Sequence, residues 1–545
     1  DMAKVRLHVQ EKYLPVSYLD TRQIYDMTLA CSDRYRDYYE AVISIDVVCL
    51  RYFFELEDTS GQVTYFGNHE FHDTCVTDIE LMFDCPQTLR EEERFLLPGW
   101  AKNKVIYQIF PSRFATDKEV PDKVWYQAPI DLDADLQGSL RGIIDRLDHL
   151  QELGVDILYM TPVFRSGSSH KYNTDDYYAI DPSFGTKEDL RELVQKAHSR
   201  GMYVILDGVF NHTSVNFFAF QDLKEKEEQS KYLDWYYPRS FPLTAKQGER
   251  PSYKTFSFVG GMPKLNLRNK EAADFAIDVA SYWIRECDID GWRLDVADEI
   301  HHGFWKRFRR EIKAVKPDAL IVGEVWHYAG DFLEGDEWDS VMNYPFCHAV
   351  RDLVARGILR PSELLSDLGF LRGNLHRDVE GYLWNFIDTH DTARFLYSAG
   401  DDPRKQRLAF QLLLPGMPMI YYGDEVGMTG CSDRDCRRGM LWDEARQDKD
   451  TLAWYQRLVR LRRQAPALTE GTVVRQWAED GEGLLFIERQ LGDRRVTLVF
   501  HTEEGTASLP ELRGQYDLIS GQEFSGTLGG YEAAVLAEAG GGREV

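Results

Sequence analysis

Through the middle of the chain, short apolar runs alternate with stretches in which apolar residues recur every three or four positions. The runs predict buried parallel β-strands and the stretches predict amphipathic helices, the latter most clearly at 140–154, 187–201 and 303–317. The apolar runs lie at 105–110, 156–160, 204–209, 290–296, 320–325, 340–344, 382–388 and 417–423. This α/β alternation predicts a (β/α)8 TIM barrel, although the same units could build a doubly wound sheet.

The two ends of the chain have a different pattern, in which polar and apolar residues alternate along short runs. Such alternation is typical of antiparallel strands with one buried face. Pro98 and Gly99 mark the change to the barrel pattern, and the alternation returns after about residue 465. The sequence therefore predicts an N-terminal β-sandwich over 1–98, a barrel over 99–465 and a C-terminal β-sandwich over 466–545.

One connection in the predicted barrel is much longer than the others. It follows the third strand and predicts a small inserted domain over 213–265. Loops beyond about 12–15 residues are usually functional or form a small domain of their own. Because this one follows Asp207 directly, we expect it to wall one side of the barrel mouth.

Composition and charge narrow the range of partners. With 43% hydrophobic and 13% aromatic residues, the chain of 545 residues has the composition of a globular protein. Nucleic acid and anionic membrane surfaces would repel a net charge of −26, so we expect neither as a partner. A neutral substrate such as a sugar is compatible with this charge.

The ends of the chain and its cysteines predict a cytoplasmic protein. The first residues lack the apolar segment of a signal peptide, and the apolar stretch 408–422 is short and interrupted by Pro415 and Pro418. The eight cysteines show no metal-ligand spacing, so we expect reduced thiols.

Four acidic residues lie at the ends of four apolar runs: Asp207, Asp295, Glu324 and Asp391. A carboxylate at the end of a buried strand has a high desolvation cost unless it is paired, hydrogen-bonded or used in chemistry. In a barrel, the carboxyl ends of the strands meet at one mouth, where catalytic groups lie. Four acids at this mouth indicate a hydrolytic site rather than four unrelated turns.

Asp295 and Glu324 are the best candidates for a catalytic pair. Neighbouring strands lie about 4.8 Å apart, so these carboxyls can approach within about 5–5.5 Å, the separation found in retaining glycosidases. Arg293 lies two residues before Asp295 on the same strand face, and we expect it to lower the pKa of Asp295. The apolar neighbours of Glu324, including Trp326, are expected to raise its pKa. A salt bridge between Arg293 and Asp295 that only braces the barrel is the alternative.

The segments around these acids resemble the signature segments of the α-amylase family, glycoside hydrolase family 13. They read LDGVFNH, GWRLDV, GEVW and the pair His390–Asp391, in the family's order, and the resemblance covers about residues 100–460. The segment MPKLN (262–266), the segment GEVWH and the N-terminal sandwich resemble the neopullulanase, cyclomaltodextrinase and maltogenic amylase subgroup.

The resemblance implies a role for each matching residue. Asp295 would be the nucleophile, Glu324 the acid/base, and Asp391 a third carboxylate that grips sugar hydroxyls. Tyr172 resembles the aromatic platform under the sugar, and Asp433 and Arg437 resemble a pair that holds the next sugar. The residues implied to bind substrate or to support the nucleophile are His170, Tyr172, Asp207, His212, Arg293, Asp298, Glu299, Trp326, His327, His390, Asp433 and Arg437.

The chain departs from the family pattern at two places. Asp298 stands where the subgroup usually has Asn, which puts an extra carboxylate on the acceptor side of the cleft. Many relatives bind calcium through an Asn- and Gly-rich loop after the first strand, but residues 110–123 lack that composition. We therefore expect no metal and no cofactor.

These observations predict a retaining hydrolase of α-1,4-glucosidic bonds in cyclodextrins, pullulan and maltooligosaccharides. An α-glucosidase, or a transglycosylase that forms α-1,6 links, is the alternative within the same chemistry. A catalytically inactive sugar-binding or partner subunit is less favoured, because all three carboxylates are present. The resemblance further implies a homodimer formed through the N-terminal, starch-binding-module-like domain.

Overall fold

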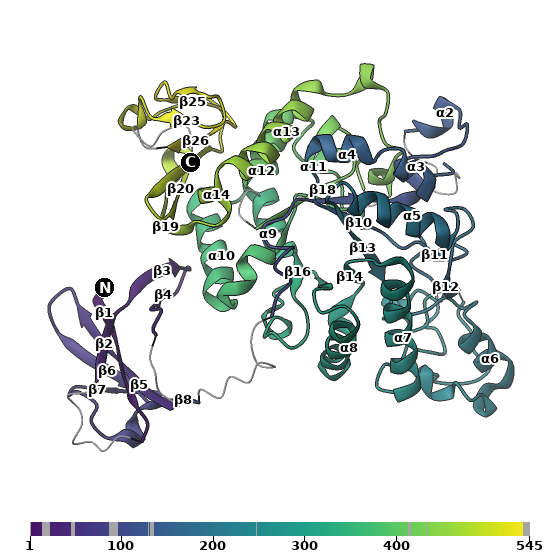
Figure 1. Cartoon of the computed structure of the whole chain (residues 1–545), viewed down its shortest axis with the longest axis horizontal. Helices are drawn as coiled ribbons and strands as arrows, with labels where there is room; N and C mark the ends of the chain where they lie inside the picture. The colour runs from purple at the N-terminus through teal and green to yellow at the C-terminus, as the bar shows by residue number, and fades with distance from the viewer. Residues whose placement is uncertain are drawn as a thin grey trace. The chain divides into compact units, whose positions relative to one another are not determined.

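The computed structural model describes residues 2–13, 22–44, 49–86, 96–128, 130, 136–246, 248–412, 416–432 and 434–537. The chain divides into two compact units. One consists of Asp1–Arg94 with Leu365–Asn374, and the other of Phe95–Leu364 with Leu375–Val545. Each unit is described below by itself, with the element labels of Figure 1.

A closed barrel of parallel strands forms the centre of the larger unit (Figure 1). Hydrogen-bonded neighbours follow the order β10-β13-β14-β15-β16-β17-β18-β9, and β9 closes the ring against β10. The strands are β9 (Ile106–Ile109), β10 (Ile157–Met160), β13 (Tyr203–Gly208), β14 (Gly291–Leu294), β15 (Leu320–Val325), β16 (Ser340–Asn343), β17 (Trp384–Asn385) and β18 (Met417–Tyr421). The predicted barrel is confirmed, and the doubly wound sheet is excluded.

Helices surround the barrel strands, with one exception among the connections. They are α1 (Pro111–Phe114), α2 (Asp122–Trp125), α3 (Leu140–Ile144), α4 (Leu147–Leu153), α5 (Lys187–His198), α7 (Lys270–Cys287), α8 (His302–Val315), α9 (Tyr344–Val350), α11 (Phe395–Ser398), α12 (Pro403–Leu412), α13 (Lys449–Gln464) and α14 (Pro466–Thr469). The helix α10 (Pro361–Asn374) begins in this unit, and its residues Leu365–Asn374 belong to the smaller one. Between β15 and β16 there is only the 3-10 turn Gly330–Phe332, so a helix does not follow every strand as predicted. Within the described residues, no helix combines the length and the apolar character needed to cross a bilayer.

Local sequence signals explain where these helices begin and end. Thr186 and Asp189 form a capping box at the start of α5, and the Asn269 side chain accepts two backbone N–H groups at the start of α7. Gly154 ends α4 in the left-handed conformation (φ 89°), which a residue with a Cβ rarely adopts. The barrel strands are buried on both faces, which is why their sequences are continuous apolar runs.

The predicted insertion lies between β13 and α7. Its regular elements are α6 (Phe218–Lys226) and three short 3-10 helices, and isolated bridges join His212 to Lys264 and Thr255 to Pro263. These bridges hold the end of the insertion beside the end of β13. A shorter excursion after β10 contains the hairpin β11 (Phe164–Arg165) and β12 (Asp176–Ile180), whose connecting loop contains His170 and Tyr172.

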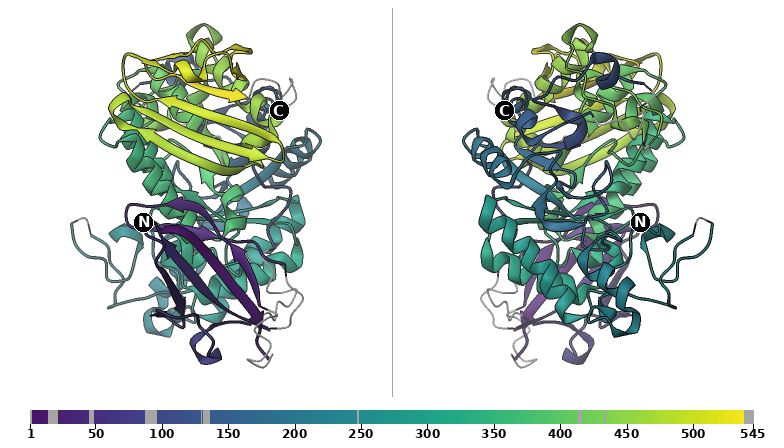
Figure 2. Two further views of the ribbon diagram at one scale, coloured as in Figure 1. Left: turned by 90° about the vertical axis from the view of Figure 1, so that its left-hand side faces the viewer. Right: turned by 90° about the vertical axis from the view of Figure 1, so that its right-hand side faces the viewer.

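The smaller unit is built on an antiparallel sheet. Its strands are β1 (Met2–Glu11), β2 (Gln23–Asp26), β5 (Cys49–Asp58), β6 (Val63–Gly67), β7 (Glu70–His72) and β8 (Phe83–Pro86), with β3 (Thr28–Ser32) and β4 (Asp37–Glu40) as a separate pair. The left view of Figure 2 shows strands of the main sheet side by side, in purple. Phe53, Val76 and Met82 form its core. The N-terminal β-domain is confirmed.

The C-terminal part of the larger unit is a second antiparallel β-domain, as predicted. The main sheet has the order β19-β20-β21-β26-β23-β24, and β22 pairs with β25. Its strands are β19 (Thr472–Glu479), β20 (Leu484–Leu491), β21 (Arg494–His501), β22 (Thr506–Ser508), β23 (Tyr516–Asp517), β24 (Gln522–Glu523), β25 (Thr527–Gly529) and β26 (Ala533–Ala537). Residues of both sheets, such as Phe486 and Leu528, share one core.

Candidate active site

The predicted acids meet at the carboxyl end of the barrel, because the strand register aligns them. Asp207 on β13 pairs in register with Arg293 on β14, and Arg293 pairs with Val322 on β15. Asp295 follows the end of β14, and Glu324 lies near the end of β15. Three neighbouring parallel strands thus deliver three carboxylates to one edge of the barrel.

The Arg293 guanidinium is the common partner of these three carboxylates. Its Nη1 donates to both oxygens of Asp207 (3.1 and 3.0 Å) and to Asp295 Oδ1 (3.1 Å), and its Nη2 forms an ion pair with Glu324 Oε1 (2.8 Å). All four side chains are buried. One guanidinium therefore serves three buried carboxyl groups, and its single charge is shared among them.

The electrostatics of Asp295 differ from the prediction. Burial raises the pKa of Asp295 well above its ordinary value, and the negative charge of Glu324 raises it further. Arg293 does act in the expected direction, but its single charge is divided among three carboxylates and does not outweigh burial. The pKa of Asp207 is likewise raised by burial, to about 6. The expected lowering of the Asp295 pKa is therefore wrong.

The surroundings of Glu324 are more polar than the sequence indicated. Besides Arg293, the backbone N–H of Val296 donates to Glu324 Oε2 (3.0 Å) and the indole N–H of Trp326 donates to Oε1 (3.1 Å). Val296 adopts φ 46° and ψ 48°, a left-handed conformation that is exceptional for a β-branched residue. This local strain belongs to the turn in which the Val296 amide donates to Glu324.

A chain of hydrogen bonds links His390 to Asp207. The Gln108 amide donates to His390 Nδ1 (2.7 Å), which leaves the proton of a neutral imidazole on Nε2. The Tyr172 hydroxyl lies 2.5 Å from that Nε2 and 3.1 Å from Asp207 Oδ2. Burial lowers the pKa of His390 well below its ordinary value, which agrees with a neutral ring. Tyr159 donates a second hydroxyl to Asp207 Oδ2 (2.7 Å).

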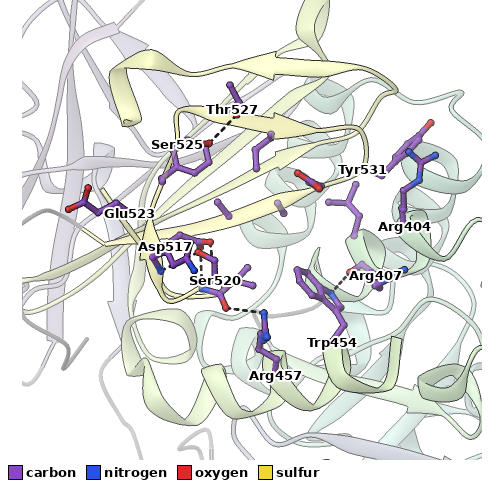
Figure 3. A pocket seen from close by; sticks show the side chains of 18 residues that line it. Arg404, Arg407, Trp454, Arg457, Asp517, Ser520, Glu523, Ser525, Thr527 and Tyr531 are labelled. Atoms are coloured by element: carbon purple, nitrogen blue, oxygen red, sulfur yellow. Dashed lines mark hydrogen bonds between the residues drawn. The ribbon is translucent and has the colours of Figure 1, made fainter. Parts of the chain in front are cut away.

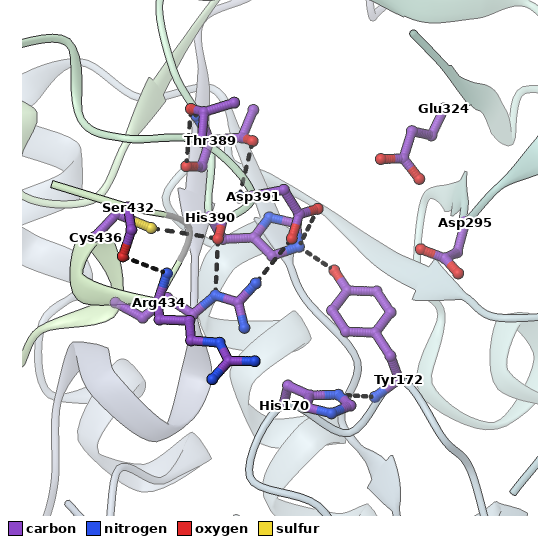
Figure 4. Close-up of polar contacts among 12 residues, drawn as sticks. His170, Tyr172, Asp295, Glu324, Thr389, His390, Asp391, Ser432, Arg434 and Cys436 are labelled. Carbon is purple, nitrogen blue, oxygen red and sulfur yellow. Dashed lines mark hydrogen bonds and ion pairs between the residues drawn. The ribbon is translucent and has the colours of Figure 1, made fainter. Parts of the chain in front are cut away.

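Asp391 is held on the other side of the site from the catalytic pair. Figure 4 shows it beside His390 and Tyr172, with Asp295 and Glu324 together across the gap. Arg437 Nη2 donates to Asp391 Oδ1 (2.8 Å), while His390 Nε2 lies 3.1 Å from Oδ2. Arg437 was predicted to hold the next sugar together with Asp433; it contacts Asp391, and Asp433 lies outside the described residues.

Several aromatic and imidazole rings of the site lie close to one another. The Tyr172 ring is parallel to the His390 ring (centroids 5.4 Å apart, 2° between planes), and the His170 ring also lies near the Tyr172 ring (centroids 5.9 Å apart, 30° between planes). His212 is stacked with Phe256 of the insertion (5.2 Å). Burial lowers the pKa of His170 to about 4 and that of His212 to about 3, so both imidazoles are neutral hydrogen-bonding groups near neutral pH.

One cavity of about 560 Å³ collects most of the predicted residues. Its lining residues are His170, Tyr172, His212, Phe256, Met262, Asp295, Val296, Asp298, Glu299, Glu324, Trp326, Asp391 and Arg437. Asp207, Arg293 and His390 lie behind this lining and position it.

Asp298, which lines this cavity, forms a pair with His327, which does not. His327 Nε2 lies 3.1 Å from Asp298 Oδ2. Glu299 is bound instead by Lys264 Nζ (3.0 Å) and by the Asn211 amide (3.1 Å). The segment that contains Lys264 therefore reaches the site through Glu299.

Several residues that matter here were not singled out from the sequence. Gln108 is a polar residue inside the apolar run 105–110, and that contrast could have identified it. Tyr159, Val296 and Phe256 gave no such signal, because an aromatic or aliphatic residue in an apolar run reads as core. Their positions depend on contacts between elements far apart in the sequence.

The loop after the first barrel strand contains α1 and leads to the start of α2 at Asp122. Among the described residues, no group of three or more His, Cys, Asp or Glu side chains is arranged to hold a metal ion. The expectation that the protein uses no metal and no cofactor remains a prediction.

Comparison with known proteins agrees with this geometry. Residues 108–453 match the family described as alpha amylase, catalytic domain, and residues 1–88 match alpha amylase, N-terminal ig-like domain. Neopullulanase 2 of Thermoactinomyces vulgaris is 43% identical over 515 residues, which cover 92% of this chain and 87% of that protein. An intracellular maltogenic amylase of Bacillus subtilis (strain 168) is 38% identical over 487 residues, covering 88% and 82%. A solved cyclomaltodextrinase structure superposes with a TM-score of 0.90 at 37% identity, covering 99% and 93%.

A (β/α)8 barrel with paired carboxylates in a sugar-sized cavity defines a glycoside hydrolase. The chain belongs to the α-amylase family, as the matches to its catalytic and N-terminal domains show.

Proposed function

We propose that this glycoside hydrolase cleaves α-1,4-glucosidic bonds with retention of configuration, using Asp295 as nucleophile and Glu324 as general acid and base. The observation that carries the proposal is that both carboxylates bind one guanidinium, Arg293, and line one cavity with Asp391. Asp295 and Glu324 come from the neighbouring strands β14 and β15, and neighbouring strands lie about 4.8 Å apart; this supports the double displacement of a retaining enzyme, whose two carboxyls are about 5–5.5 Å apart.

The reaction proceeds in two displacements. In the first, an oxygen of Asp295 attacks the anomeric carbon while the bond from that carbon to the glycosidic oxygen breaks, and Glu324 gives its proton to that oxygen. In the second, Glu324 takes a proton from water, the water oxygen attacks the anomeric carbon, and the ester bond to Asp295 breaks. Each cycle returns both carboxyl groups to their starting protonation states.

The electrostatics of the cluster supply the required proton. Three buried carboxylates share one guanidinium, and burial raises the pKa of both Asp207 and Asp295. The cluster therefore retains a proton at a pH where isolated carboxyls would have lost theirs. The proposed mechanism requires this proton to be on Glu324, where the leaving oxygen can receive it, and Asp295 to be ionised next to Arg293.

The opposite wall would hold the sugar ring. Asp391 is anchored by Arg437 and presents its carboxylate to the cavity, so it can accept hydrogen bonds from sugar hydroxyls. The Tyr172 ring provides an apolar surface for a sugar face, and the neutral His212 and His390 imidazoles are suited to hydrogen bonds with hydroxyl groups. Trp326, stacked on Tyr344 and 47% exposed, extends this wall on the side of Glu324.

The substrates we propose are cyclodextrins, pullulan and maltooligosaccharides. The names of similar proteins, a neopullulanase and a cyclomaltodextrinase, support this choice of α-glucans. Measuring rates on β-cyclodextrin, pullulan and soluble starch side by side tests it. A rate on soluble starch above the rates on β-cyclodextrin and pullulan would contradict this choice.

The substitution Asp295→Asn tests the assignment of the nucleophile. We expect turnover of maltotriose to fall by at least about 10³-fold, because no covalent ester can form, while maltotriose still binds. Asp318→Asn, at an exposed position outside the cavity, is the matched control and should leave turnover unchanged. Full turnover by Asp295→Asn would remove the proposed role.

A second outcome, transfer to a sugar acceptor, follows from Asp298. This carboxylate lines the cavity close to the proposed acid/base and contacts His327 (3.1 Å). Product analysis on maltotriose distinguishes hydrolysis, which gives maltose and glucose, from transfer, which gives longer or α-1,6-linked products. Asp298→Asn should change the ratio of these products rather than the rate of the first displacement.

We also propose a cytoplasmic homodimer formed through the N-terminal domain. The name of a similar protein, an intracellular maltogenic amylase, supports the location, and the dimer follows from the family resemblance of residues 1–88. Sedimentation of the full chain tests the dimer. A single species with the mass of one chain, 63.2 kDa, would contradict it.

A further inference from the structure

A second pocket, which shares no lining residue with the cavity at the barrel mouth, lies between the C-terminal sheet and two barrel helices. One wall comes from α12 and α13, with Arg404, Arg407, Trp454 and Arg457. The facing wall comes from residues 517–534, which include β23, β24 and β25. Its volume is about 410 Å³, within the ~300–1,000 Å³ typical of small-molecule sites.

The charges that line this pocket balance one another. Three guanidinium groups are matched by three carboxylates, those of Asp517, Glu523 and Glu532. A phosphate or carboxylate ligand would gain little there, since the three arginines of one wall face three carboxylates of the other and the lining has no net charge. A neutral ligand with many hydroxyl groups can use both kinds of side chain, as donors and as acceptors.

Part of this polar lining has hydrogen-bonding capacity to spare. Among the described residues, Arg407 and Arg457 have no carboxylate within ion-pair distance, and their contacts are to carbonyl oxygens of Pro403 (3.2 Å) and Ile519 (3.4 Å). Arg404, in contrast, is bound by carboxylates outside the pocket lining, such as Glu504 (2.8 Å). The two less occupied arginines are therefore the available donors.

An aromatic side chain, Trp454, lines the pocket together with these arginines. Figure 3 shows the Trp454 side chain rising from its helix into the pocket, with Arg457 nearby. Trp454 and Arg457 are three residues apart on α13, so they share one face of the helix. The indole N–H donates to the Arg407 carbonyl (3.2 Å), which fixes the ring edge and leaves the ring itself to line the pocket. Tyr531 forms a second aromatic wall, with Lys405 Nζ 4.9 Å from its ring centre.

We propose that this pocket is a second, non-catalytic binding site for a short α-glucan. The ligand class rests on the proposed function, which makes α-glucans the substrates and products of this chain. One face of a glucosyl unit would pack on the Trp454 ring, because the C–H groups of a sugar face are apolar. Its hydroxyl groups would accept from Arg407 and Arg457 and donate to Glu523.

The test is the binding stoichiometry of maltotriose, measured by titration calorimetry on the full chain with Asp295→Asn, which prevents turnover. We expect two bound maltotriose molecules per chain. Adding Trp454→Ala should remove one of them, and adding Arg457→Ala should weaken that same one by at least tenfold. Arg460→Ala is the matched control. Arg460 lies three residues after Arg457 on the same helix, α13, and it does not line this pocket.

The outcomes separate this inference from the proposed function. One bound maltotriose in the Asp295→Asn chain, or two bound molecules retained after Trp454→Ala, would overturn the second site. Binding of inorganic phosphate at the pocket in place of maltotriose would also overturn it. Unfolding temperatures of the variants are compared, because the Trp454 side chain on α13 also contacts α12. If Trp454→Ala is unstable, Arg457→Ala, at an exposed position, decides whether the second site exists. Turnover of maltotriose by the unsubstituted chain tests the proposed function independently.

Discussion

The two ends of the barrel differ in the number of cations that are paired with each buried carboxylate. At the amino end, Asp339 just before β16 accepts from Arg309 (2.6 Å), from Lys313 (2.8 Å) and from the backbone N–H of Ile321 (2.9 Å). At the carboxyl end, Asp207, Asp295 and Glu324 share one guanidinium. The first arrangement gives one acid two cations, and the second gives three acids one cation.

Asp290, just before β14, repeats the arrangement of the amino end. Its oxygens are bound by His198 Nε2, Lys316 Nζ and the Val204 N–H, each at 2.8 Å. Asp290 and Asp295 lie at opposite ends of the same short strand, so the sequence alone places two similar acids five residues apart. The number of cations around each acid, and not its burial, distinguishes a structural carboxylate from a reactive one.

The largest effect that sharpens this comparison is the loss of the proposed acid. Glu324→Gln should lower turnover of maltotriose by about 10²–10⁴-fold, because the glycosidic oxygen of maltotriose needs a proton in order to leave. The same variant should act much faster on an aryl glucoside with an acidic phenol, whose oxygen leaves without protonation. Steady-state rates on both substrates make the measurement. An equal loss on both would indicate that Glu324 acts by some route other than proton donation.

Breaking the amino-end arrangement should affect stability instead of chemistry. Asp339→Asn leaves Arg309 and Lys313 beside a neutral amide, and we expect the free energy of unfolding to fall by about 3–5 kcal/mol. Urea unfolding followed by tryptophan fluorescence measures this loss. The rate per folded molecule on maltotriose should stay the same. A variant that is stable but inactive would contradict the division between the two ends.

The pH dependence of stability should reveal the crowded carboxylates. The pKa of Asp207 is raised to about 6, so the folded chain binds more protons than the unfolded chain between pH about 4 and 6. This contribution makes the protein less stable as the pH rises through that window. Asp207→Asn should remove this contribution. The urea midpoint of the variant minus that of the parent should therefore rise from pH 4 to pH 6.5. A constant difference would contradict the raised pKa.

The smallest expected effect is also a loss of stability as the pH rises. It comes from the amino end of the barrel and appears at a higher pH. The hydrogen bond with Asp290 raises the pKa of His198. The stabilisation is fully present below the unfolded pKa of about 6.5 and is lost as the pH rises through the higher folded pKa. His198→Gln should therefore cost less stability at pH 9 than at pH 6, as measured by unfolding midpoints. Equal costs would show that the charge of His198 is not involved.

Much of this structure could be predicted from the sequence, because the signals are local. Continuous apolar runs predicted the barrel strands, since strands buried on both faces need no alternation. The acids at the ends of these runs predicted the site, because parallel strands bring their carboxyl ends to one mouth. The missing helix between β15 and β16 was not predictable in this way, since a general strand and helix alternation does not exclude one short connection.

The direction of the Asp295 pKa shift was predicted incorrectly from the same residues. Arg293 next to Asp295 indicated a lowered pKa, because the sequence shows one cation beside one anion. Only the folded barrel brings Asp207 and Glu324 to the same guanidinium and removes water from all of them, and together these raise the Asp295 pKa.

The sequence by itself determined the order of strands, the residues at their ends and the family to which the chain belongs. These depend on periodicity and on residues near one another in the chain. The tertiary structure alone decided which charges share a partner, how Val296 turns its amide toward Glu324, and that α13 and the C-terminal sheet enclose a second pocket. The reason is physical: desolvation and Coulomb energies depend on distances in space, and neighbours in space such as Gln108 and His390 are 282 residues apart along the chain.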